Sequence, residues 1–238
     1  MKIEIWSDFI CPFCYIGKRL LDQAIAAFNH KEQIEVIYKS YELHPDVESD
    51  EGISVHEMLA GKMGVSVEEA SAMNERVKAH AASVGLDYQF DSMKQTNTLD
   101  AHRLLKYAET AGLASAYTER LFKAHFTESV FIGKKENLLR LAEEAGLNRV
   151  QAEQVLSSDA YLDEVRRDQL EGQTLGVRGV PFFVFNRKYA ISGAQPLELF
   201  QETLDRVWKE ENHLPSEYEI EPNGDVCTGD GCEVGEKE

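Results

Sequence analysis

The order of hydrophobic and polar positions predicts a strand–helix–strand opening. Residues 2–7 alternate between apolar and mainly charged side chains, as in a half-buried strand. Apolar residues then recur every three or four positions over residues 11–30, which predicts a helix with Pro12 in its first turn. Residues 34–43 are rich in β-branched and aromatic side chains and predict a second strand.

A long helical region separates this opening from a second β segment. Ser54 and Ser66 each precede a glutamate by three residues, the pattern of a capping box at a helix start. Asn97 is expected to cap a further helix. More helices are predicted at residues 114–126, 135–145, 148–157 and 159–174, followed by strands at 182–185 and 188–192 and a last amphipathic helix at 196–211.

The resulting order is β-α-β, a helical block, then β-β-α. This is the thioredoxin arrangement, so we expect an α/β, thioredoxin-like fold with a large all-helical insertion. We place the two parts of the thioredoxin-like domain at residues 1–44 and 175–213, and the insertion at 45–174. Residues 214–238 form an acidic tail that carries a C-x4-C pair.

Composition and charge exclude several classes of partner. The chain has 238 residues, of which 43% are hydrophobic, enough for a sizeable core. A net charge of −17 argues against binding to nucleic acid or to anionic membranes. No apolar run approaches the roughly 18 residues of a membrane span. The first ten residues lack the apolar stretch of a signal peptide, so we expect a cytoplasmic protein.

Cys11 and Cys14 form a CxxC pair at the junction of the first strand and helix. Such a pair serves as two zinc ligands, a structural disulfide or a redox-active dithiol. Stable disulfides are rare in the cytoplasm, which leaves redox chemistry and zinc. A structural zinc site needs four ligands, and Cys227 and Cys232 have a different spacing. The redox interpretation is therefore favoured, and no metal is expected.

The position of Cys11 at the start of the helix makes it the expected nucleophile, because unpaired N–H groups and the helix dipole favour a thiolate there. Cys14 lies almost one turn further on and is placed to resolve a mixed disulfide. Phe13 adds no positive charge, so the stabilisation of the thiolate should be milder than with histidine at that position. Asp8 either tunes the pair, relays a proton or is a solvated loop carboxylate.

Val180 and Pro181 precede the third strand, where thioredoxin-like folds place a cis-proline opposite the CxxC pair. With that pair present we expect a cis bond here rather than an ordinary trans proline at a strand start. The Val180 backbone would then be free to pair with a substrate peptide beside the sulfur.

Four blocks resemble, in order, the DsbA-like thioredoxin family and within it the cytoplasmic FrnE-type oxidoreductases. They are WSDFICPFCYIG (6–17), NTLDAHR (97–103), GVRGVPFFVF (176–185) and ISGAQP (191–196). The resemblance covers about residues 1–212. It implies dithiol–disulfide exchange with protein or small-thiol substrates. It also implies that Cys11 is the nucleophile, Cys14 the resolving cysteine and Pro181 the cis-proline.

Other residues remain open between functional and structural roles. Asn97 and His102 are expected to tune the site or contact substrate. His102 and Arg103 are adjacent and cannot both point into one cleft, so one of these two is expected to be structural. Cys227 and Cys232 are an auxiliary redox pair, an inert tail disulfide or a tail metal site. Some FrnE-like proteins resemble this chain in having such a C-x4-C pair. The intervening glycines allow the turn that brings two sulfurs together.

The sequence therefore predicts a thiol–disulfide oxidoreductase, with disulfide isomerisation open to the same chemistry. Its expected partners are disulfide-bearing or thiol proteins and glutathione or a thioredoxin-type reductant, and it needs no cofactor. One alternative is a glutathione-dependent enzyme resembling 2-hydroxychromene-2-carboxylate isomerases and kappa-class glutathione transferases. Those proteins typically have serine where Cys11 stands. The other alternative is a zinc-binding interaction module.

Overall fold

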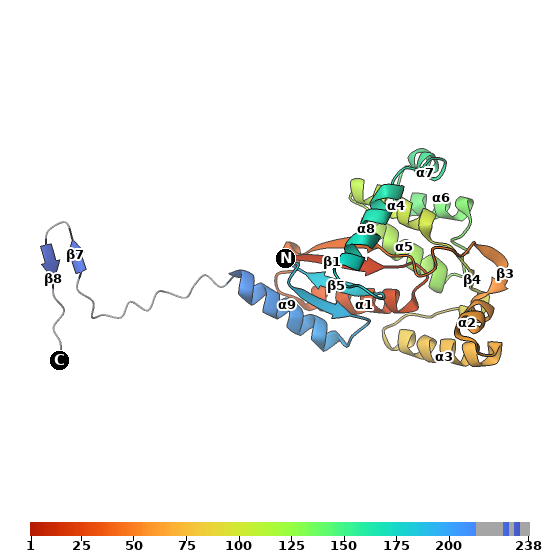
Figure 1. Cartoon of the computed structure of the whole chain (residues 1–238), viewed down its shortest axis with the longest axis horizontal. Helices are drawn as coiled ribbons and strands as arrows, with labels where there is room; N and C mark the ends of the chain where they lie inside the picture. Colours follow the sequence, from red (N-terminus) through yellow and green to blue (C-terminus); the bar gives the residue numbers. More distant parts are fainter. Residues whose placement is uncertain (213–225, 229–230, 234–238) are drawn as a thin grey trace.

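A computed structural model describes residues 1–212, 226–228 and 231–233 (Figure 1). At its centre is a four-stranded sheet in the order β2-β1-β5-β6. Its strands are β1 (Lys2–Ser7), β2 (Glu35–Ser40), β5 (Phe182–Phe185) and β6 (Tyr189–Ser192). β1 and β2 are parallel, whereas β5 pairs antiparallel with both β1 and β6. The predicted thioredoxin-like fold is confirmed.

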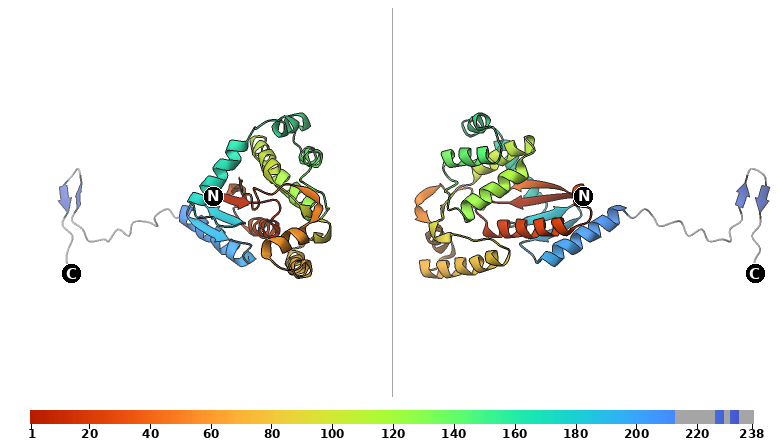
Figure 2. Two further views of the ribbon diagram at one scale, coloured as in Figure 1. Left: turned by 45° about the vertical axis from the view of Figure 1, so that its right-hand side comes forward. Right: turned by 180° about the vertical axis from the view of Figure 1, so that it is seen from behind.

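Helices cover both faces of this sheet (Figure 2). Helices α1 (Pro12–Ala27) and α9 (Leu197–Asn212) pack together on one face, where the Phe183 ring meets Phe200 of α9 edge-on, with centroids 5.0 Å apart. On the other face lies α8 (Leu162–Thr174). There the fully buried Trp6 donates its indole N–H to the Asp168 carbonyl at 2.8 Å. Trp6 therefore belongs to the core.

Gly172 lets α8 approach the sheet this closely. A Cβ at this position would stand 2.7 Å from Nε1 of Trp6, closer than real Cβ atoms come to a neighbour. The absence of a side chain therefore sets the distance between α8 and β1.

The region between β2 and β5 is mainly helical, whereas the sequence predicted an all-helical insertion. Ser54 and Ser66 both form complete capping boxes. One feature was not predicted: β3 (Asp50–Ser54) pairs antiparallel with the short β4 (Lys94–Gln95), although neither segment alternates clearly. The helices are α2 (Val55–Met63), α3 (Val67–Ser83), α4 (Leu99–Thr110), α5 (Ala114–Phe126), α6 (Lys135–Glu144), α7 (Arg149–Leu156) and α8, with a short 3-10 helix at Phe90–Ser92. A second 3-10 helix, at Lys31–Gln33, lies before β2.

A buried cluster of charges joins α8 to β2 and α4. The Asp168 carboxylate, on a residue that is 5% exposed, lies 3.1 Å from Nζ of Lys39 and 2.6 Å from Nζ of Lys106. It also accepts the Ser40 backbone N–H at 2.9 Å. Because the carboxylate is paired on each side, the cost of burying its charge is offset.

The two cysteines near the C-terminus lie in a separate two-stranded pairing. β7 (Val226–Thr228) and β8 (Gly231–Glu233) run antiparallel, with Cys227 opposite Cys232. Opposite positions in such a pair are about 4.5–5.5 Å apart at Cα, within the range that a disulfide spans. Their side chains lie outside the described part of the chain, so the auxiliary redox pair stays a prediction. No helix in the described ranges is long and apolar enough to cross a membrane.

Candidate active site

The CxxC pair lies at the start of α1, after the short turn that follows β1. Pro12 is the first helical residue and Cys11 is the N-cap, and the Cys14 N–H donates to the Cys11 carbonyl at 3.0 Å. Both cysteines are free and buried, with exposures of 4% and 2%. Cys11 therefore lies at the positive end of the helix dipole, the position that favours a thiolate.

The Val180–Pro181 peptide bond is cis, as predicted from the sequence, and it faces the cysteines. The Cys11 Sγ lies 3.5 Å from the Val180 carbonyl oxygen. Gly17 lets α1 lie close to Pro181 and the start of β5, because a Cβ at position 17 would stand 3.1 Å from Cγ of Pro181 and 3.0 Å from the Phe183 ring. The structure thus brings together Cys11, Val180 and Pro181 from opposite ends of the chain.

Cys14 is buried, and burial changes the pKa of its thiol. Burial raises its pKa well above the ordinary value, and the adjacent Cys11 thiol raises it further. Hydrogen bonds from the Ser7 side chain and the Asp8 backbone act in the opposite direction. The net result favours the protonated thiol of Cys14 while Cys11 reacts.

Asp8 is fully buried, so it is not a solvated loop carboxylate. One of its oxygens accepts the Leu43 N–H at 2.7 Å and the other lies 3.3 Å from Nε2 of His102. His102 comes from α4 and is 1% exposed, and its Nδ1 has no hydrogen-bond partner within the described ranges. The insertion thus contacts the segment that leads into Cys11. The tuning role of this pair stays a prediction.

Phe13 and Asn97 have different surroundings. Phe13, between the cysteines, is 41% exposed and its ring centroid lies 6.2 Å from that of His80. The Asn97 amide donates to the Val47 carbonyl at 2.9 Å, and its oxygen accepts the Leu99 N–H at 2.9 Å. Asn97 therefore fastens the loop after β2 to the start of α4, although the N-cap is Thr98 rather than Asn97.

The prediction that His102 and Arg103 point in different directions is confirmed. The Arg103 guanidinium donates to the Ala160 carbonyl at 2.9 Å and also contacts the carbonyls of Val155 and Ser158. It satisfies carbonyls at the end of α7, away from Asp8.

Two residues that lie near the site were not predicted to do so from the sequence. The fully buried Tyr88 donates its hydroxyl to the Pro12 carbonyl at 2.7 Å, so the insertion holds the CxxC turn directly. His125, at the end of α5, is 4% exposed and lines a cavity beside Pro12. Neither has a spacing relation to the cysteines, and only tertiary packing brings them close.

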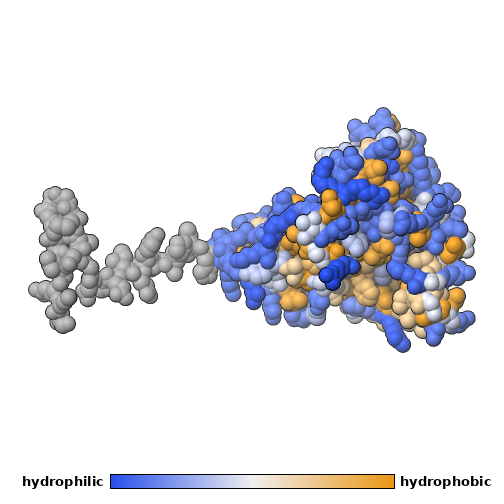
Figure 3. Space-filling view, viewed as in Figure 1, coloured by the Kyte–Doolittle hydropathy of each residue, from blue (hydrophilic) through white to orange (hydrophobic). Residues whose placement is uncertain are grey.

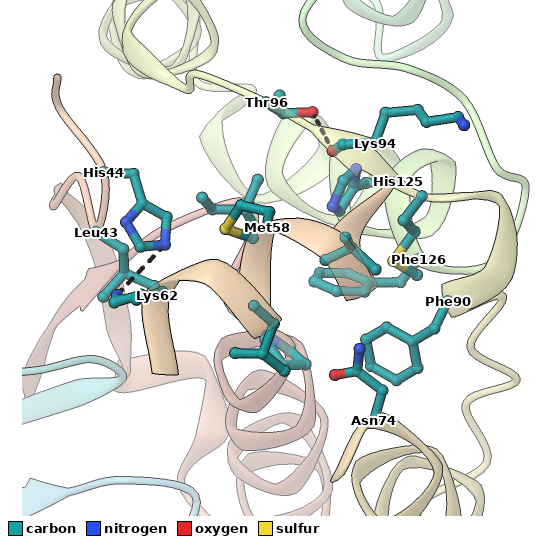
Figure 4. A pocket seen from close by; sticks show the side chains of 15 residues that line it. Leu43, His44, Met58, Lys62, Asn74, Phe90, Lys94, Thr96, His125 and Phe126 are labelled. Atoms are coloured by element: carbon teal, nitrogen blue, oxygen red, sulfur yellow. Dashed lines mark hydrogen bonds between the residues drawn. The ribbon is translucent and has the colours of Figure 1, made fainter. Parts of the chain in front are cut away.

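The cavity holds about 200 Å³ and lies between the CxxC turn and the insertion (Figure 4). Ile10 and Pro12, on either side of Cys11, form part of its lining. α2, the segment around β4 and the end of α5 supply most of the remainder. Figure 3 also shows apolar surface at the end of the molecule formed by α2 and α3, where Met63 and Val67 are exposed.

Among the described residues, no group of three His, Cys, Asp or Glu side chains could hold a metal ion.

This fold and cysteine arrangement define a thioredoxin-like protein with a CxxC site. The chain belongs to the DSBA-like thioredoxin domain family, whose model matches residues 2–205.

Solved structures agree with this assignment. A probable DsbA oxidoreductase from Streptomyces coelicolor is 38% identical, with 98% of this chain and 99% of that chain covered and a TM-score of 0.83. Two others share the fold at 17% identity. A 2-hydroxychromene-2-carboxylate isomerase has a TM-score of 0.64, with 89% and 98% covered. The cytosolic disulfide reductase DsbM from Pseudomonas aeruginosa has a TM-score of 0.62, with 88% and 100% covered.

Proposed function

We propose that this protein is a thiol–disulfide oxidoreductase that uses Cys11 and Cys14 as its reactive dithiol. The observation that carries the proposal is the position of Cys11 at the N-terminus of α1, with its sulfur 3.5 Å from the Val180 carbonyl and Cys14 buried beside it. A substrate backbone that reaches Val180 would bring its own sulfur to Cys11.

The cycle transfers two electrons between dithiol and disulfide. The Cys11 thiolate attacks one sulfur of a substrate disulfide, forming a mixed disulfide and releasing the other sulfur as a thiolate. Cys14 then loses its proton and attacks the Cys11 sulfur, which releases the second substrate thiol. The substrate is reduced and the protein is oxidised. The reverse sequence donates a disulfide, and the two directions together constitute isomerisation.

The same proposal extends to the setting and the auxiliary residues. We infer a FrnE-type protein of the cytoplasm, with protein or small-thiol substrates and glutathione or a thioredoxin-type reductant as recycling partner. The likeness to a cytosolic DsbM, also solved with GSH, supports this inference at the level of the fold. Asp8 and His102 would tune the pair from their buried contact, and Cys227 and Cys232 would pass disulfides to it.

A glutathione redox titration of the whole chain tests the function, with each cysteine read by differential alkylation and mass. We expect Cys11 and Cys14 to oxidise together, reversibly, into one intramolecular disulfide. If Cys11 formed only a stable glutathione adduct, a glutathione-dependent isomerase or transferase would replace this proposal. Stoichiometric zinc bound to the reduced pair would replace it with a zinc-binding module. The same data show whether Cys227 and Cys232 titrate as a second pair.

A further inference from the structure

The lining of the cavity beside Cys11 has a charge opposite to that of the whole chain. The protein has a net charge of −17, yet none of the described lining residues is Asp or Glu. The walls are mainly apolar, and two lysines and two histidines are the ionisable groups among them. Such a lining suits a ligand that combines an apolar body with a negative charge.

His125 offers this cavity a buried hydrogen-bonding group. It is 4% exposed, and its ring makes no hydrogen bond within the described part of the chain, only an edge-on contact with Phe126. Burial lowers the pKa of His125 to about 4, although the Asp8 charge acts to raise it, so the imidazole is neutral at physiological pH. Figure 4 shows the ring among the lining side chains. A ligand that hydrogen-bonds to this unpaired ring therefore gains affinity.

Lys62 supplies a positive charge at the opposite side of the cavity. Its Nζ lies 3.5 Å from Nε2 of His44, and no carboxylate in the described ranges is within ion-pair distance of it. Burial and the nearby Lys62 charge lower the pKa of His44, whereas Asp8 acts to raise it. His44 is therefore neutral and the charge rests on Lys62, an arrangement that attracts an anion.

The size of the cavity limits the occupant. Its volume of about 200 Å³ is a little larger than the roughly 150 Å³ apolar cavity that holds benzene, and smaller than a drug-sized pocket. One aromatic ring or branched alkyl group fits. Ile10 and Pro12 are the sequence neighbours of Cys11, so the occupant lies next to the turn that carries the nucleophile, although Cys11 itself does not line the cavity.

We propose that this cavity binds a small apolar carboxylate, an aryl or branched-alkyl acid that forms one half of a low-molecular-weight disulfide substrate. The proposal rests on the oxidoreductase function and names a substrate class for it. Lys62 binds the carboxylate, the apolar walls hold the body and His125 pairs with a polar atom. The Cys11 thiolate bonds to the sulfur of the bound half, the ligand disulfide breaks, and the other half leaves as a thiolate.

The five methionines of the chain provide an internal control for a binding experiment. Met58 and Met93 line the cavity, whereas Met1, Met63 and Met73 do not. The whole chain, oxidised and labelled with 13C at the methionine methyl groups, is titrated with 3-phenylpropanoate and followed by NMR. We expect saturable shifts at Met58 and Met93 and none at the other three.

Variants and an uncharged ligand test the role of charge. We expect 3-phenylpropanamide to bind about fivefold more weakly than the acid, as loss of a partly exposed charge-assisted contact implies. Lys62→Gln should remove this difference. Lys31→Gln, which removes an equal charge outside the cavity, should preserve it.

Three results would overturn the inference. They are unmoved Met58 and Met93 signals up to the solubility limit, equal affinity for acid and amide, and saturation of the same methyls by a phenylalanine-containing peptide but not by the acid. None of these results would refute the oxidoreductase proposal, because the glutathione titration measures the oxidation state of each cysteine without a ligand in the cavity. Conversely, failure of Cys11 and Cys14 to form a disulfide would refute the oxidoreductase proposal, but the NMR titration would still show whether the cavity binds the acid.

Discussion

Removal of the Tyr88 hydroxyl tests whether the insertion positions the reactive turn. Tyr88 is fully buried, and its hydroxyl donates to the Pro12 carbonyl at 2.7 Å. Tyr88→Phe keeps the ring and deletes only this bond. Tyr117 provides a matched control, because it is also fully buried and donates to a helical carbonyl, that of Ala101, at 3.2 Å. Tyr117 also has an edge-on ring contact with Phe9, two residues before Cys11, which Tyr117→Phe keeps.

The expected loss of stability is similar for the two variants. Pro12 and Ala101 both lie inside helices, so each carbonyl keeps its helical partner four residues on when the tyrosine hydroxyl is removed. The cost is then that of one intramolecular hydrogen bond, about 0.5–1.5 kcal/mol. For a folded part of this size that corresponds to a decrease in Tm of roughly 2–4 °C per kcal/mol.

The reactivity of Cys11 should distinguish the variants. In a Cys14→Ser background, Cys11 reacts with 4,4′-dithiodipyridine and the released thiopyridone is followed by absorbance. A looser first turn stabilises the thiolate less, so Tyr88→Phe should slow the reaction by up to about fivefold, the factor that corresponds to 1 kcal/mol. Tyr117→Phe should leave the rate unchanged. Equal rates in the two variants would refute the reasoning, because the insertion would then stabilise the turn without positioning it.

Three further predictions follow from single contacts. Gly172→Ala should lower the free energy of unfolding by about 1–3 kcal/mol, because its Cβ would meet the buried Trp6 ring. Gly61→Ala, in open space on α2, should raise it by about 0.5–1 kcal/mol; urea denaturation measures both. The pKa of His125 is depressed to about 4 from its ordinary 6.5, so its contribution to stability is lost as pH falls between these values. Wild type should therefore lose about 2 kcal/mol more than His125→Gln between pH 7 and pH 5, measured by urea denaturation at each pH. Cys14→Ser should accumulate a mixed disulfide on Cys11 with oxidised glutathione, detected by intact mass.

Each of these has a contrary outcome. Stabilisation by both alanine substitutions would show that Trp6 moves aside at no cost. If the free energy of unfolding had the same pH dependence in wild type and His125→Gln, the imidazole of His125 would bind a proton as readily in the folded state as in the unfolded state. Release of the mixed disulfide from Cys14→Ser at the wild-type rate would assign the resolving step to another thiol.

The order of the main helices and strands could be predicted from the sequence because each of these elements has a recognisable pattern of neighbouring residues. The alternation in β1, the apolar spacing of α1 and the two capping boxes all depend on neighbouring residues. The CxxC pair was found from its own spacing, and the proline before β5 was found because thioredoxin-like folds place a cis-proline opposite such a pair. β4 was missed because two residues, Lys94 and Gln95, carry no periodicity.

The rest of the site depends on contacts between distant segments. Tyr88 and His125 reach the CxxC turn only through the packing of the insertion, and no spacing relates them to Cys11. Asp8 is similar: the sequence left open whether it tunes the cysteine pair, relays a proton or is a solvated loop carboxylate. Its burial requires a Leu43 N–H and a His102 ring that the sequence places 35 and 94 residues away.

The charge cluster around Asp168 has a consequence for how this sequence can evolve. Asp168 contacts both lysines, and each lysine has a second carboxylate partner, Glu171 for Lys39 and Glu109 for Lys106. Loss of any one of the three central residues therefore leaves the others paired, so it should cost less than the roughly 3–5 kcal/mol of breaking an isolated buried pair. Lys39, Lys106 and Asp168 come from three separate elements, and these shared ion pairs let the cluster tolerate the loss of one member at a time. Among relatives of this chain the three positions should therefore be able to change one at a time, rather than only as a complete set.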